Sequence, residues 1–134
     1  MDFPVGEHID RLIAVAQANL SNMRIVRRDE RPARALIDLE GQWGIYRIII
    51  SEIILPGGDI RYAYYVLDAD NCLVHGFDNT PDVRAIKQRY GRDYRQHLGE
   101  RIPHKHDASD VLSLTEPMTL ESFITWLQEN LPQG

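Results

Sequence analysis

Two histidines separated by a single residue are the side chains of this sequence best suited to chemistry. His104 and His106 flank Lys105 within the segment Pro103–Asp107. If the segment is extended, side chains two positions apart point to the same side of the backbone, so both imidazoles would face one site. Histidine titrates near neutral pH and also ligates metal ions. The pair therefore predicts either acid–base catalysis or metal binding.

A metal site would need at least one more ligand beside the two histidines. Asp107 follows them directly, and the fold could bring Asp78 close. Either would add a carboxylate, which Zn²⁺ accepts together with imidazole. One His-x-His pair is nevertheless a weak signal for a metal, and a solvated or hydrogen-bonded loop is the more ordinary interpretation. From the sequence we assign no metal ligand and expect no cofactor.

Acid–base cleavage of RNA demands less of the sequence. It needs two titratable groups on either side of a phosphate, and a cation that stabilises charge in the transition state. Asp78 and Asn79 also fit an ordinary turn, because such side chains bond to nearby backbone groups. The residues predicted to carry this chemistry are His104 and His106 as acid and base, with Asp78 and Asn79 orienting them.

Positive charge is concentrated around the same histidines. The net charge of the chain is −5, yet residues 84–106 hold seven Lys or Arg against two acidic residues. That segment therefore carries +5 and the remainder −10. Arginine pairs bidentately with phosphate, whereas a solvated helix face is the alternative interpretation of such a run. The residues predicted to bind nucleic acid are Arg84, Lys87, Arg92, Arg95, Arg101 and Lys105.

Four other rings near this segment have two interpretations each. His75 and His97 are candidates for the same pocket, but His75 lies in a predicted strand, where packing in the core or across strands is ordinary. Tyr90 and Tyr94 lie one helical turn apart among the arginines. Aromatic rings so placed can stack on unpaired bases, or they can pack against the body of the protein.

The elements that must position these residues follow from apolar periodicity. The length of 134 residues and the composition are typical of one globular domain, here residues 1–134. Polar turns such as 56–59 separate β-branched runs, which predicts an antiparallel meander of five or six strands. The predicted strands are Met23–Arg28, Ala35–Glu40, Trp43–Leu55, Ile60–Leu67 and Cys72–Phe77, with Gly41-Gln42 as a turn and Pro103–Asp107 extended or irregular.

Three helices are predicted to flank this sheet, giving an α+β fold. The first has an apolar stripe with three- and four-residue steps and ends at Ser21-Asn22. The last is capped by Thr119. A middle helix begins at Thr80-Pro81-Asp82, with the hydroxyl of Thr80 as its cap, and ends at Gly91, whereas residues 92–101 are left unassigned. The predicted buried stripes are Ile9, Leu12, Ile13, Ala16 and Leu20; Val83, Ile86 and Tyr90; and Leu120, Phe123, Ile124, Leu127 and Leu131.

Other sequence features predict a cytoplasmic protein. Cys72 is the only cysteine, which fits a reducing compartment. The longest apolar run, Tyr46–Leu55, is interrupted by polar residues and is far shorter than the ~20 residues of a membrane span. The first ten residues are acidic, unlike the positive opening of a secretory signal. We therefore expect no membrane association.

Three segments of the chain resemble the TumE-like toxin family. They are Tyr62–Asp68, the turn Gly76–Pro81 and the segment Pro103–His106. In that family a strand ends in an aromatic-Asp-Asn-small-Pro turn, and a Pro-His-x-His segment and a closing helix follow. The resemblance spans residues 46–131. Family members often place histidines directly after the turn proline, where this chain has Asp82-Val83, and the gap between the two motifs is longer here.

The resemblance implies the toxin of a bacterial or archaeal type II toxin–antitoxin pair. Its partner would be an antitoxin protein, often with a DNA-binding helix-turn-helix, and its target would be RNA or translation. The leading expectation is a toxin-type, metal-independent ribonuclease. The alternatives are a non-catalytic protein-interaction module and a metal-dependent hydrolase that uses the His-x-His segment. A homodimer through a sheet edge is a further expectation, because twofold dimers are the commonest oligomers.

Overall fold

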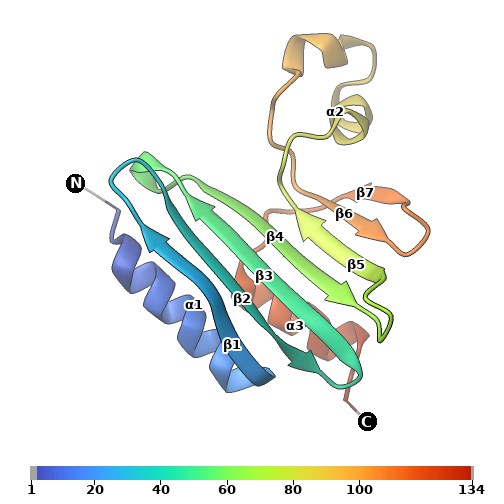
Figure 1. Ribbon diagram of the computed structural model, residues 1–134. Coiled ribbons are helices and arrows are strands. Elements are labelled where there is room, and N and C mark those ends of the chain that lie inside the picture. Colours follow the sequence, from blue (N-terminus) through green and yellow to red (C-terminus); the bar gives the residue numbers. More distant parts are fainter. Residues whose placement is uncertain (1–2, 134) are drawn as a thin grey trace.

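One seven-stranded antiparallel sheet organises the chain, as a computed structural model that describes residues 3–133 shows (Figure 1). Each strand pairs with the next in sequence, so the predicted meander and the α+β class are confirmed. The sheet has one strand more than expected, because residues 112–114 add an edge too short to show alternation. The strands are β1 (Ser21–Glu30), β2 (Ala35–Trp43), β3 (Tyr46–Ile54), β4 (Ile60–Leu67), β5 (Leu73–Asp78), β6 (His104–Asp107) and β7 (Leu112–Leu114).

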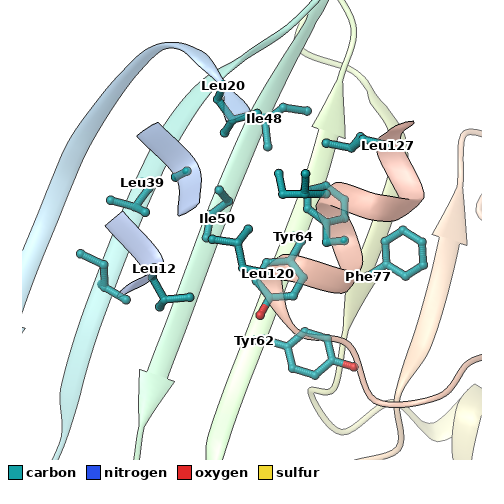
Figure 2. Close-up of a cluster of buried hydrophobic side chains, with 14 of the residues drawn as sticks. Leu12, Leu20, Leu39, Ile48, Ile50, Tyr62, Tyr64, Phe77, Leu120 and Leu127 are labelled. Carbon is teal, nitrogen blue, oxygen red and sulfur yellow. The ribbon is translucent and has the colours of Figure 1, made fainter. Parts of the chain in front are cut away.

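Two helices cover one face of the sheet and form the main core with it. They are α1 (Val5–Asn19) and α3 (Leu120–Asn130), which contact each other as well as the strands. Figure 2 shows side chains of both helices meeting those of β2 to β5. Burial of each large aliphatic side chain contributes roughly 1.5–3 kcal/mol. Fully buried members of this core are Ile9, Leu12, Ile37, Leu39, Ile48, Ile50, Tyr64, Leu120, Phe123 and Leu127.

The remaining helical segments are short. The helix α2 (Val83–Tyr90) continues into the 3-10 helix η2 (Gly91–His97), which occupies the stretch that sequence reasoning left unassigned. Figure 1 shows both beyond the end of the sheet, away from α1 and α3. A 3-10 turn, η1 (Pro56–Gly58), joins β3 to β4. Within residues 3–133, no helix combines the length and apolar character that crossing a membrane requires.

The turn between β2 and β3 differs from the prediction. It lies at Gly44-Ile45 rather than at Gly41-Gln42, because β2 pairs with β3 as far as Trp43 and Tyr46. Gly44 has φ of +60°, and glycine at the first central position suits a two-residue hairpin turn that matches the strand twist. The prediction failed because a Gly-Gln pair was taken as a turn although it continues the alternating pattern of β2.

The start of α2 also differs from the prediction. Its cap is Asp82, whose carboxylate accepts a hydrogen bond from the backbone N–H of Arg84. The Thr80 hydroxyl donates to Asp78 instead, so the helix begins at Val83. Val83 is therefore 48% exposed, whereas it was predicted to be buried. Ile86 is buried and the helix ends at Gly91, as expected.

Helix α3 matches its predicted cap and stripe. The Thr119 hydroxyl accepts from the backbone N–H of Ser122, and the Ser122 hydroxyl accepts from the N–H of Thr119, which forms a capping box. The residues Leu120, Phe123, Ile124 and Leu127 are buried against the sheet. Leu131 lies at the helix end and is partly buried against the same core.

Candidate functional site

The pairing of β5 with β6 brings Asp78, His104 and His106 together. Asp78 is opposite His104 in the ladder, and Gly76 is opposite His106. Because alternate residues of a strand share a face, the three side chains project from the same side of the sheet. This is the face opposite to α1 and α3. The two histidines therefore project from one face of a strand, as the sequence predicted for an extended segment.

The three side chains lie close enough to share one ligand. His104 Nε2 is 3.1 Å from Asp78 Oδ1, and His106 Nε2 is 3.7 Å from Asp78 Oδ2. The ligand atoms of the three residues all lie within 4.8 Å of one another. The His104 side chain is only 1% exposed, whereas that of His106 is 14% exposed. Access to the site therefore passes over His106.

Neighbouring groups fix the orientation of His104 and Asp78. His104 Nδ1 lies 2.7 Å from the Ile102 carbonyl, which can only accept, so the proton sits on Nδ1. Nε2 is buried and makes no well-aligned hydrogen bond despite its proximity to Asp78. Asp78 Oδ1 accepts from both the backbone N–H and the hydroxyl of Thr80. Metal-ligating histidine and carboxylate groups typically have hydrogen-bonded neighbours of this kind.

Charged residues surround the outer edge of the site. Arg84 Nη2 and Asp110 Oδ1 each lie 3.5 Å from His106 Nδ1. Arg84 also pairs with Asp82 and Asp110 and remains half exposed. An exposed guanidinium beside the accessible histidine could hold an anionic group of a substrate.

Burial and hydrogen bonding act in opposite directions on the titration of this site. Burial raises the pKa of Asp78, but the adjacent His104 and the hydrogen bonds from Thr80 outweigh it, and the net pKa is lowered. Burial lowers the pKa of His104, but Asp78 and the Ile102 carbonyl outweigh it, and the net pKa is raised. Burial raises the pKa of Tyr65, and the nearby Asp78 carboxylate raises it further. Asp78 and His104 therefore shift each other's pKa in opposite directions.

Asn79 lies beside Asp78 in sequence, but its side chain bonds to the backbone of β4. Its Oδ1 accepts from the backbone N–H of Tyr62, and its Nδ2 donates to the Ile60 carbonyl. Both ends of the amide are therefore committed to the start of β4. The geometry gives Asn79 no contact with either histidine, unlike the orienting role predicted for it.

Lys105 and Arg101 lie apart from the histidines they were predicted to assist. Lys105 alternates to the opposite face of β6, where its Nζ lies 5.8 Å from the ring centroid of Phe77 and 5.7 Å from that of Trp126. Arg101 forms an ion pair with Asp59 and lines a cavity on the α1 and α3 side. Neither residue supplies a cation to the Asp78 site.

The other predicted nucleic-acid contacts lie on the lobe formed by α2 and η2. Arg84 is beside His106, as described above. Within residues 3–133, no carboxylate lies at ion-pair distance from Lys87, Arg92 or Arg95. Lys87 and Arg95 both lie over the ring of Tyr94, at 4.9 and 5.1 Å from its centroid. This lobe is an exposed basic surface next to the site.

The other three rings in question have packing roles. Tyr90 stacks on His97 with centroids 3.5 Å apart, which removes both from the candidate pocket. His75 faces α3, where its ring meets Trp126 edge-on at 4.8 Å, as the packing interpretation expected.

Sequence reasoning missed the residues that support the site. Thr80 was assigned to a helix cap, although an aspartate in a turn often accepts a hydrogen bond from the backbone N–H two residues on, as Asp78 does from Thr80. Ile102 contributes only its backbone carbonyl, and no pattern of side chains in the sequence predicts such a contact. No protein-family model, no curated protein and no solved structure matches the chain. The geometry described above is therefore the ground on which a function is proposed.

Proposed function

We propose that this chain is a metal-dependent hydrolase in which Asp78, His104 and His106 bind one divalent transition-metal ion. The sequence offered this function as an alternative to a metal-independent ribonuclease. The observation that carries it is His104: a 1%-exposed imidazole holds its Nδ1 proton against the Ile102 carbonyl and presents an unpartnered Nε2 to a carboxylate. A buried acceptor facing an anion is unfavourable unless a proton or a metal ion lies between them.

The dimensions of the site suit such an ion. Tetrahedral ligands at bonds of roughly 2.0–2.1 Å are about 3.4 Å apart. The separations of 3.1 Å from Asp78 Oδ1 to His104 and 3.7 Å from Asp78 Oδ2 to His106 lie on either side of this value, and all three ligand atoms lie within 4.8 Å of one another. Two imidazoles and one carboxylate suit Zn²⁺, Fe²⁺, Mn²⁺ and related ions.

Three protein ligands leave a coordination position free, which distinguishes catalytic from structural sites. An ion of this class supplies a Lewis acid and lowers the pKa of water that it binds. Of the chain's own residues, Thr80 would hold the Asp78 carboxylate and Ile102 would hold the tautomer of His104. Arg84 would bind the anionic part of the substrate beside His106.

The exposed basic lobe favours a phosphodiester over other hydrolysable anions. Lys87, Arg92 and Arg95 lie at ion-pair distance from no carboxylate of residues 3–133, as noted above, and lie next to the site on the same lobe as Arg84. A basic surface of this kind binds the backbone phosphates of a nucleic-acid strand. The toxin role and the antitoxin partner rest on the resemblance of the sequence alone, and they are part of the proposal on that basis.

Metal binding is tested directly by titrating chelator-treated protein with Zn²⁺ and Mn²⁺ in a calorimeter. We expect one site per chain in the wild type and at least about tenfold weaker binding after His106→Ala, which removes a ligand at the accessible side. His97→Ala is the matched control, because that histidine lies outside the site. Equal affinity for wild type and His106→Ala would refute the metal site.

Hydrolysis is tested separately with single-stranded RNA and a chromogenic phosphodiester. Activity should disappear with chelator and return with added metal. Metal binding without hydrolysis of either substrate would leave a structural metal site and refute the hydrolase. Chelator-resistant cleavage would instead favour the second candidate.

That second candidate is the metal-independent ribonuclease, and one contact favours it. Asp78 lies beside His106, and the exposed Arg84 lies on the other side of the same ring. His106 alone would then act as the acid–base group, because His104 is too deeply buried to touch a phosphate. His106→Ala should in that case lower the rate by ~10²–10⁴-fold in the presence of chelator.

A further inference from the structure

A second candidate site lies on the opposite side of the sheet. A cavity of about 400 Å³ is lined by residues of α1, β3, β4 and the start of α3. This volume is within the range of small-molecule sites. Tyr62 and Tyr64 line the cavity, whereas Ala63 between them pairs with Asp78 on the other face. The cavity is therefore separate from the proposed metal site.

A buried carboxylate is the main polar group of this cavity. Glu52 is 2% exposed, and its Oε2 accepts from the Tyr64 hydroxyl at 2.6 Å. Its Oε1 lies 2.7 Å from His8 Nε2. A carboxylate at this depth needs partners, because an isolated buried charge is costly.

The protonation of His8 follows from its second neighbour. Arg11 Nη2 lies 3.2 Å from His8 Nδ1. A guanidinium only donates, so Nδ1 must accept and the single ring proton sits on Nε2, where it donates to Glu52. The Glu52 carboxylate is therefore held by one ring N–H and one hydroxyl.

The other carboxylates of the cavity have cationic partners. Asp59 pairs with Arg101, and Glu121 lies 3.6 Å from Arg11. Within residues 3–133, Glu52 is the one cavity carboxylate without a Lys or Arg side chain at ion-pair distance. It is therefore the carboxylate that remains for a cationic ligand.

Aromatic rings line the same space. Tyr62 and Tyr64 stack with centroids 5.1 Å apart, and Figure 2 shows them next to Leu120 at the start of α3. Aromatic rings attract organic cations, and their apolar edges accept an aliphatic chain. The other two carboxylates of the cavity already have arginine partners, so a hydrated inorganic cation would find one carboxylate here without an arginine partner.

We propose that this cavity binds a small organic cation, a protonated primary amine with a short apolar chain. Its ammonium group would donate to Glu52 and neutralise it, while its chain would lie against Tyr62. The inference does not depend on the metal site, because the two sites share no residue.

The test uses n-butylamine as the probe, with butyrate and n-butanol as probes of similar size but opposite or no charge. We expect butylamine alone to bind in calorimetry and to raise the unfolding temperature of the whole protein. Glu52→Gln removes the charge from this hydrogen bond and should weaken binding at least about tenfold. Glu129→Gln is the matched control, since Glu129 is exposed on α3.

A second variant keeps the test decisive if Glu52→Gln does not fold. Pro117 lines the cavity but is exposed, so Pro117→Trp should close the mouth without touching the partners of Glu52. Binding of butylamine must then be lost in a folded protein. Preferential binding of butyrate would show that the arginines dominate, and equal binding of all three probes would show a merely apolar cavity. Either result, or no binding of butylamine to the wild type, overturns the proposal.

Discussion

Asp78 and Asn79 are adjacent, yet their side chains stabilise different parts of the molecule. The Asn79 amide joins the Ile60 carbonyl to the Tyr62 N–H, both at 2.9 Å. Asn79→Ala leaves these two backbone groups without their partner, so we expect a loss of about 1–3 kcal/mol in the free energy of unfolding. Urea denaturation measures this change. Metal affinity should not change, and a parallel loss of metal binding would contradict the separation of roles.

The Thr80 hydroxyl offers a test of the groups that hold the proposed metal ligands in place. It donates to Asp78 Oδ1 at 2.7 Å, while the backbone N–H of Thr80 donates to the same oxygen. Thr80→Val removes only the hydroxyl contact, and the loss of such a partner lowers metal affinity about 10–100-fold. Calorimetric titration with Zn²⁺ provides the measurement. Thr125→Val, on the exposed side of α3, is the control and should leave the affinity unchanged.

His75 makes stability depend on pH. Burial lowers its pKa below the ordinary value, the nearby Lys105 lowers it further, and Asp107 opposes both. The unfolded chain therefore binds a proton more readily than the folded one. The stability that neutral His75 provides is complete above about pH 6.5, the ordinary pKa of histidine. It is lost as the pH falls through the lowered pKa of the folded state.

The measurement compares His75→Phe with the wild type across pH 5 to 8. The phenyl ring keeps the edge-on contact with Trp126 and cannot titrate. We expect the wild type to lose more stability than the variant as the pH falls. Identical pH dependence in the two proteins would show that His75 keeps its ordinary pKa.

At the scale of elements, the period of two in β6 explains both a success and an error. It placed His104 and His106 on one face, as the sequence predicted. It also placed Lys105 on the opposite face, which the same period of two could have predicted. Predicting that Asp78 pairs with His104 requires the register of β5 against β6. The α2–η2 segment lies between these two strands in sequence, so local patterns do not give that register.

Other features were beyond local reasoning. The strand β7 has three residues, too few to reveal alternation. Thr80 and Asp82 are both good helix caps, and only the competing bond from Thr80 to Asp78 decides between them. His8 and Glu52 are 44 residues apart and meet only after α1 packs on the sheet.

Gly76 in β5 sets how closely the site can pack. A Cβ at this position would lie 2.8 Å from Cδ1 of Tyr65, closer than carbon atoms approach. Gly76→Ala must therefore displace the Tyr65 ring beside Asp78, and overpacking costs about 1–3 kcal/mol. Thermal or urea unfolding measures the loss. Gly6→Ala in α1 is the matched control: its Cβ would have ordinary contacts, and alanine favours helix by roughly 0.5–1 kcal/mol.

For the whole molecule, the uneven distribution of charge has a geometric counterpart. The +5 segment 84–106 folds largely into the lobe of α2 and η2, which Figure 1 shows beyond the end of the sheet. The rest of the chain carries −10 and repels a polyanion. An RNA strand would therefore approach from the lobe side, where Arg84 leads to the proposed metal site.

This arrangement predicts that affinity for single-stranded RNA depends on where positive charge lies rather than on how much there is. One variant replaces four lobe cations by glutamine and another replaces four exposed arginines elsewhere, so both have the same net charge. The lobe positions are Lys87, Arg89, Arg92 and Arg95, and the control positions are Arg27, Arg31, Arg34 and Arg61.

Fluorescence anisotropy at several salt concentrations gives the slope of log affinity against log salt. Each phosphate contact contributes about −0.7 to that slope on single strands, because its counterions are released. The lobe variant should bind weakly, with a slope shallower by up to about 3, whereas the control variant should resemble the wild type. Equal losses in both variants would mean that RNA senses only net charge. If the wild type does not bind RNA at low salt, RNA is excluded as the ligand of the lobe. A phosphodiester substrate would then have to reach Arg84 without contacting the lobe.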